Sequence, residues 1–89
     1  GYNRLAVAYI QKARETGDFS LNSKAEAAVS RALEIQPDDI TAQKLRASLH
    51  LTFHRFADAL ELGKRLQKEM PKDAFVYGVL TDANIELGN

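Results

Sequence analysis

Apolar residues recur at helical spacing in five segments of the chain, and Gly, Pro, Asp and Ser stand between these segments. Apolar residues three or four positions apart share one face of a helix, whereas a half-buried strand alternates apolar and polar residues. The pattern therefore predicts an all-α chain. Its helices are expected near 2–16, 21–36, 39–53, 55–70 and 73–87.

Local signals mark the ends of the predicted helices. Gly17 is a helix stop. Pro37 and Pro71 each disfavour helical dihedrals in the residue before them, so each is expected to follow the end of a helix. Asp39 and Asp73 then stand at the N-cap positions of the next helices. A carboxylate at an N-cap accepts hydrogen bonds from free backbone N–H groups and contributes about 1 kcal/mol.

These signals recur with a period of 34 residues. The stretch RALEIQPDD at residues 31–39 is followed by RLQKEMPKD at residues 65–73, and the arginine, the proline and the final aspartate agree in both. Fixed periods of roughly 20 to 50 residues are typical of helical solenoids and arrays. The connections between the predicted helices are short, which favours antiparallel helix pairs.

A helix pair of 34 residues that ends in proline resembles the tetratricopeptide repeat. The stretch HRFADAL at residues 54–60 is similar to the junction between the two helices of that repeat, with His54 in place of a glycine. The small residues that the family places at helix crossings correspond to Ala25, Ala47 and Ala59. We therefore expect the fold of that family.

The resemblance implies an α-α superhelix that covers the whole chain as a single domain of about two and a half repeats. The first repeat would span 3–37, the second 38–71, and the first helix of a third repeat 72–89. The first repeat holds about seven additional residues, close to two helical turns, so each of its helices is expected to be about one turn longer. Ser23 and Glu26 have the spacing of a capping box, which either caps the second helix or follows a short lead-in turn.

The faces that pack within and between helix pairs are expected to carry small and aliphatic residues. Small residues at crossing points let helix axes approach to about 8 to 10 Å. Positions that are usually aromatic in the family instead hold Gln43, His50 and Gly63. The predicted core consists of Leu5, Ala6, Tyr9, Ala25, Ala28, Ala32, Leu45, Ala47, Leu49, Ala59, Leu62, Leu66, Val79, Leu80 and Ala83.

Composition and charge exclude several classes of partner. The 12 Lys and Arg residues balance the 12 Asp and Glu residues, and no basic block is present that would bind nucleic acid or an anionic membrane. No apolar run approaches the ~18 to 20 residues that span a bilayer. The absence of cysteine excludes disulfides and thiolate chemistry and leaves the compartment undecided. Because the chain opens at Gly1, we expect it to be part of a longer protein.

No arrangement of residues predicts catalysis. His50 and His54 are four positions apart and could contact a metal ion, but the spacing supplies no third ligand. The carboxylates of Glu15, Asp38 and Asp39 are not paired as an acid and a base. We therefore expect a protein without enzymatic activity, a metal site or another cofactor.

The resemblance also implies a function. In the tetratricopeptide family, the first helix of each pair lines a concave face that binds a protein or peptide partner. This chain is therefore expected to be a protein-interaction scaffold. The residues expected to bind the partner are Lys44, Ser48, Leu51, Thr52, Phe75, Gly78, Asp82, Ile85 and Glu86. The resemblance also adds Asn3, Val7, Ile10 and Gln11 from the first helix.

The expected binding face is mixed in character. Leu51, Phe75 and Ile85 would supply apolar contacts, and the charged residues would set the orientation of the partner. Some family members grip a C-terminal carboxylate with basic and amide side chains. Ser48 and Asp82 stand at positions where those side chains are needed, so this kind of ligand is not expected.

The last predicted helix, residues 73–87, has an unusual glycine and an unfinished helix pair. Gly78 lies inside it, where glycine costs about 1 kcal/mol relative to alanine. Gly78 therefore has two interpretations. Either a neighbouring helix or a bound peptide approaches the backbone closely there, or glycine is simply tolerated in an end helix. The second function hypothesis is self-association, in which this helix completes its unfinished pair with another copy of the chain.

Overall fold

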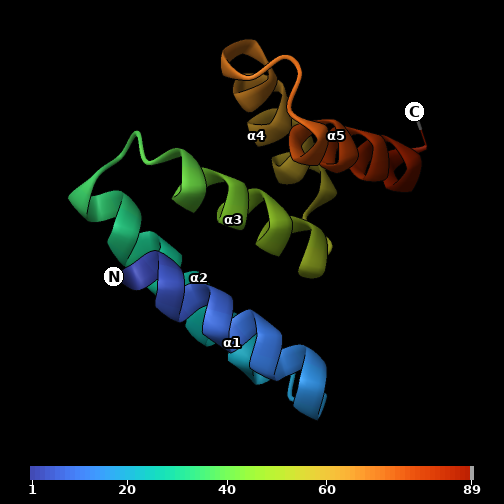
Figure 1. Cartoon of the computed structure of the whole chain (residues 1–89). Coiled ribbons are helices and arrows are strands. Elements are labelled where there is room, and N and C mark those ends of the chain that lie inside the picture. The colour runs from blue at the N-terminus through green and yellow to red at the C-terminus, as the bar shows by residue number, and fades with distance from the viewer. Residues whose placement is uncertain (89) are drawn as a thin grey trace. The chain divides into compact units, whose positions relative to one another are not determined.

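A computed structural model describes residues 1–88, and these residues form five α-helices and no strand (Figure 1). The helices are α1 (Tyr2–Thr16), α2 (Ser20–Ile35), α3 (Ile40–Thr52), α4 (Phe56–Glu69) and α5 (Ala74–Leu87). Each predicted boundary lies within one residue of the observed one. The all-α prediction is confirmed.

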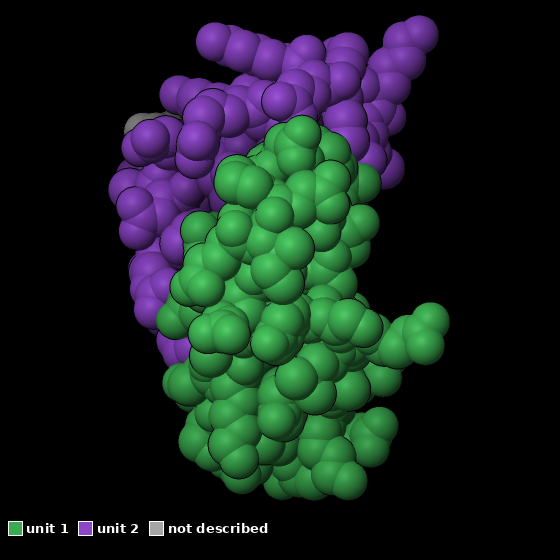
Figure 2. Space-filling model, turned by 90° about the vertical axis from the view of Figure 1, so that its left-hand side faces the viewer, with its two compact units in different colours: residues 1–46 green, residues 47–89 purple. Residues whose placement is uncertain are grey.

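The chain divides into two compact units, Gly1–Arg46 and Ala47–Asn89 (Figure 2). The division falls inside α3, so each unit contains one end of that helix. In the first unit α1 packs against α2, and in the second α4 packs against α5. Packing between consecutive helices is the arrangement that a helical hairpin array requires.

The two Pro-x-Asp turns have the same hydrogen bonds. Gln36 and Met70, which precede the prolines, leave the helical region with φ of −142° and −135°. The Asp39 N–H donates to the Gln36 carbonyl at 3.0 Å, and the Asp73 N–H donates to the Met70 carbonyl at 3.1 Å. The 34-residue period of the sequence is therefore also a period of the backbone.

The predicted N-caps of α3 and α5 are confirmed. An Asp39 side-chain oxygen, Oδ1, accepts a hydrogen bond from the Ala42 N–H at 3.1 Å. Asp73 Oδ1 accepts one from the Val76 N–H at 3.0 Å. Both carboxylates therefore accept from the third residue of the helix that they precede, as N-cap side chains commonly do.

The start of α2 excludes one of the two alternatives for Ser23, and the length of α2 differs from the prediction. Gly17 ends α1 in the left-handed conformation, with φ of 74°, as expected. Asp18 Oδ1 accepts a hydrogen bond from the Ser20 N–H at 3.1 Å, and α2 begins at Ser20. Ser23 therefore lies inside α2 and does not cap it. Helix α2 has 16 residues and α4 has 14, so α2 is longer by about half a turn and not by a full turn.

Burial repeats with the same 34-residue period. Four positions of α2 and the four equivalent positions of α4 are buried, and two further pairs relate α3 to α5. Burial on one stripe of each helix is what side-by-side packing of helices produces. The buried pairs are Ala25 and Ala59, Ala28 and Leu62, Val29 and Gly63, Ala32 and Leu66, Ala42 and Val76, and Leu49 and Ala83.

Most of the predicted core is buried, with three exceptions. Leu5 is 43% exposed, and Tyr9 and Leu45 are half-buried. Ala6 and Ala13 are the buried residues of α1, which packs against α2, so Leu5 is turned toward solvent. The prediction for Leu5 was wrong because α1 has apolar residues around most of its circumference. Its small residues, and not its largest ones, lie on the face that packs.

Gly63 permits a close approach of α4 and α5. A Cβ atom at this position would lie 3.0 Å from Leu80 Cδ2 and 3.4 Å from Val79 Cγ1. Leu80 and Val79 thus occupy the space beside Gly63. By the resemblance, Gly63 stands at a position that is usually aromatic in the tetratricopeptide family. A Cβ at Gly78 would meet no described atom within 4 Å, so no neighbouring helix accounts for that glycine.

Replacing each glycine by leucine tests this difference. Gly63→Leu is expected to lower the free energy of unfolding by roughly 1 to 3 kcal/mol, because the contact with Leu80 would be overpacked. Gly78→Leu is expected to raise it by up to about 1 kcal/mol, because leucine favours the helix and has open space. Urea unfolding followed by circular dichroism measures both changes. Equal effects of the two substitutions would contradict the close approach at Gly63.

Candidate functional site

Helix α5 has one buried face and one open face. The buried face contains Val76, Val79, Leu80 and Ala83. The open face contains every α5 residue that the sequence analysis assigned to partner binding. These residues are Phe75, Gly78, Asp82, Ile85 and Glu86, of which only Gly78 is half-buried and the others are exposed.

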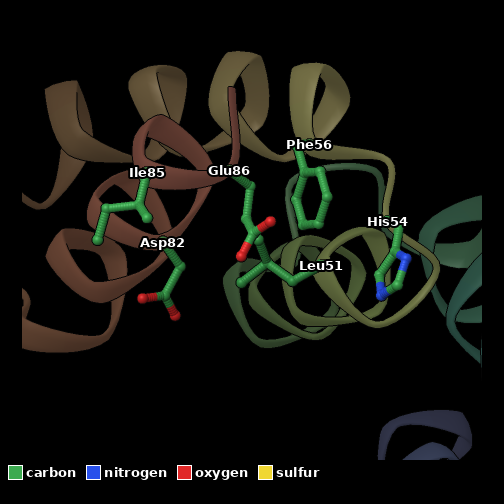
Figure 3. Close-up of a pocket in the computed structure, with 6 residues that line it drawn as sticks. All are labelled: Leu51, His54, Phe56, Asp82, Ile85 and Glu86. Carbon is green, nitrogen blue, oxygen red and sulfur yellow. The ribbon is translucent and has the colours of Figure 1, made fainter. Parts of the chain in front are cut away.

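The end of the open face borders a hollow of about 270 Å³ in the second unit. Three helices contribute to its lining, and Figure 3 shows the side chains. Glu86 extends from α5 toward Leu51, and the Asp82 carboxylate points away from the other labelled side chains. The lining residues are Leu51 of α3, His54 of the turn after α3, Phe56 of α4, and Asp82, Ile85 and Glu86 of α5.

Backbone geometry fixes the position of His54. The His54 N–H donates to the Leu51 carbonyl at 3.1 Å, and the Arg55 N–H donates to the His50 carbonyl at 2.7 Å. This pair of hydrogen bonds is the Schellman motif, whose turning residue adopts the left-handed conformation. His54 has a φ of 59°. It therefore adopts a backbone conformation that glycine, the residue of the similar junction in the tetratricopeptide repeat, adopts without strain.

The imidazole of His54 is held against a neighbouring ring. Its centroid lies 5.3 Å from that of Phe56, and the two ring planes are 19° apart. Stacked rings at this separation attract one another. His54 and Phe56 together form one wall of the hollow.

The structure brings together four of the predicted binding residues, namely Leu51, Asp82, Ile85 and Glu86. His54 and Phe56 also line the hollow but were not among the predicted binding residues. The signal for His54 was present, because the junction of α3 and α4 was identified. Its location beside the last turn of α5 depends on the packing of α5, which no local pattern reports.

The other predicted residues lie elsewhere. Thr52 Oγ1 donates to the Ser48 carbonyl at 3.1 Å, and both residues are half-buried in α3. Phe75 and Gly78 lie on the open face of α5, nearer its start than the hollow. Lys44 belongs to the first unit and is half-buried there. The assignment of these five residues to partner binding stays a prediction.

A second hollow, of about 660 Å³, lies in the first unit near the start of α1 and the end of α2. Two polar contacts lie at or near this hollow, and the buried Asn3 Oδ1 has no hydrogen-bond partner among the described residues. Asn3 Nδ2 donates to Asp39 Oδ2 at 2.9 Å, while the other oxygen of Asp39 caps α3. The Arg31 guanidinium lies 5.8 Å from the centre of the Tyr2 ring. The hollow of the second unit is the better candidate for binding because four of the predicted binding residues line it, whereas only Asn3 of the predicted residues lines this one.

The described residues contain no group of three or more His, Asp or Glu side chains that could hold a metal ion. His54 lies beyond the end of α3 and stacks on Phe56, so it does not continue the helix face of His50. Within residues 1–88, no helix combines the length and the apolar character needed to cross a membrane.

Comparison with known proteins found no matching family, curated protein or solved structure. Any inference about function therefore depends on the residues of this chain and on their arrangement.

Substitutions at His54 test its left-handed conformation. Glycine adopts this conformation without strain, whereas an L-residue incurs about 1 to 2 kcal/mol. His54→Gly and His54→Ala both remove the stacked ring, so their comparison isolates the backbone term. We expect His54→Gly to be more stable to urea than His54→Ala by about 1 kcal/mol.

A control shows whether glycine is tolerated equally elsewhere. Ala27 is exposed in the interior of α2, so Ala27→Gly should lower the free energy of unfolding by about 1 kcal/mol. A His54→Ala variant as stable as His54→Gly would contradict the geometry of this junction.

Proposed function

We propose that this chain is a non-catalytic protein-interaction module of the tetratricopeptide kind, and that the second unit binds an extended or helical segment of a partner protein. The binding surface would consist of the hollow and the open face of α5. The observation that carries the proposal is the exposure of Ile85. This large apolar side chain is 68% exposed and borders the hollow that Leu51 also lines.

The arrangement of the apolar residues supports this function. Leu51 and Phe56 are half-buried and already ordered by helix packing, while Ile85 offers additional apolar area at the rim. A partner side chain that enters the hollow would cover apolar surface of all three residues. Each Å² of apolar surface removed from water stabilises the complex by about 25 cal/mol. Apolar anchors in a preformed hollow are the usual source of affinity in small interfaces.

The repeated backbone supports the tetratricopeptide assignment. The Pro-x-Asp turns, their N-caps and the buried stripes all recur at 34 residues, which is the repeat length in that family. In such arrays the first helix of each pair supplies the binding surface. Helix α5 occupies that position in the third repeat, and its open face is the one that the resemblance selects.

The proposal can be tested with random peptides of about 12 residues displayed on phage and selected on the purified chain. Leu51→Glu combined with Ile85→Lys places charges in the hollow. We expect this variant to bind the selected peptides at least about 30-fold more weakly, equivalent to about 2 kcal/mol, because the apolar anchors are lost. Fluorescence anisotropy with synthetic copies of the selected peptides measures the change.

Tyr77→Lys is the matched control. Tyr77 lies on the same helix and is also 68% exposed, but it does not line the hollow. This variant should bind the peptides within about twofold of the wild type. Circular dichroism must give the same helicity for all three proteins. Equal binding by the wild type and the Leu51→Glu, Ile85→Lys variant, or no peptide selected at all, would contradict the proposed function.

Self-association through the same face is the second candidate. The exposed Phe75 and Ile85 on the open face of α5 favour it, since both would be covered in a dimer. Light scattering over a wide range of protein concentration distinguishes the two functions. A concentration-dependent dimer that Ile85→Lys abolishes supports self-association, and a monomer at every concentration rules it out.

A further inference from the structure

The hollow of the second unit is negatively charged as well as apolar. Asp82 and Glu86 are the acidic residues of its lining, and no lysine or arginine lines it. Helix α5 contains no basic residue along its whole length. Neither carboxylate forms an ion pair with any residue in the described part of the chain.

This placement of charge is unfavourable for the isolated helix. Asp82 and Glu86 are four positions apart, so their carboxylates lie on the same face and repel one another. Glu86 also lies in the last turn of α5, where the helix dipole presents its negative end. Local stability would favour a basic residue at this position. Features that conflict with local stability in this way are often explained by a ligand.

The surrounding side chains restrict what this ligand can be. Leu51, Ile85 and Phe56 provide apolar contacts next to the carboxylates, so a simple inorganic cation would leave most of the hollow unused. The stacked rings of His54 and Phe56 offer an aromatic surface at the same wall. Arginine combines a positive charge with a flat group that binds carboxylates and stacks on rings, which lysine does less well.

We propose that the hollow binds a peptide segment in which an arginine stands beside a large apolar residue. The arginine contacts Asp82 and Glu86, and the apolar side chain packs on Leu51 and Ile85. The proposal rests on the proposed function, because it names the chemistry of the partner at the same surface. Charge complementarity selects this occupant over an acidic or neutral segment.

The composition of the selected peptides gives the first test. Peptides selected from the random phage library on the wild-type chain should be enriched in arginine next to leucine, isoleucine or phenylalanine. Selection in which arginine and lysine are not enriched, but binding still requires Leu51 and Ile85, would overturn this inference and leave the proposed function standing. Selection that yields no peptide would overturn both.

Charge variants give the second test, with a synthetic copy of the most enriched peptide as the probe. Asp82→Asn with Glu86→Gln is expected to weaken binding about two- to fivefold, and Asp82→Lys with Glu86→Lys at least about tenfold. Glu61 and Glu69 are exposed on α4 and do not line the hollow. Glu61→Lys with Glu69→Lys changes the net charge equally and should alter binding less than about twofold.

Salt and stability distinguish binding from a structural effect. Raising NaCl from about 0.05 M to about 0.5 M should weaken peptide binding by the wild-type chain, because salt screens the charged contacts. Binding by the variant with Asp82→Asn and Glu86→Gln should change less. Glu86→Lys should unfold at the same or a higher temperature than the wild type. Binding that is unchanged in the Asp82→Lys, Glu86→Lys protein would overturn the inference. A homodimer of this chain that the selected peptide cannot dissociate would also overturn the inference, because a second copy would then occupy the hollow.

Discussion

The packing of α5 against α4 is the interaction on which the candidate site depends. Gly63 lets Leu80 and Val79 approach α4 closely, and this contact decides which face of α5 is buried. The Pro-x-Asp turn before α5 begins the helix at a fixed point, because Asp73 caps it through the Val76 N–H. With its start and its buried face fixed, α5 must present Asp82, Ile85 and Glu86 on the open side.

The junction between α3 and α4 completes the site from the opposite direction. A left-handed His54 allows the chain to reverse within three residues, so Leu51 at the end of α3 and Phe56 at the start of α4 lie close together. An L-residue in this conformation is less stable than glycine, but the imidazole gains a stacked partner in Phe56. The same ring then forms part of the wall of the hollow. This junction thereby contributes directly to the proposed binding surface.

Local signals were sufficient to predict the helices, the two proline turns and the N-caps, because each depends on residues within one turn of the chain. The face of α1 could not be predicted in the same way, since apolar residues surround it and the small residues Ala6 and Ala13 determined the packing. Four residues of the hollow were predicted from the resemblance of α3 and α5 to groove-lining helices. His54 and Phe56 were missed, because their proximity to α5 arises only when α4 and α5 pack together.

Helix α5 is proposed to pack on α4 with one face and to bind a partner with the other. Methyl-resolved NMR of the whole chain during titration with a selected peptide tests both parts in one measurement. We expect a nuclear Overhauser effect between Gly63 Hα and a Leu80 methyl group at every step, with chemical-shift changes concentrated at the methyl groups of Leu51 and Ile85. Loss of the Gly63–Leu80 contact, or shifts concentrated at Leu5 and Ile35 of the first unit, would contradict it.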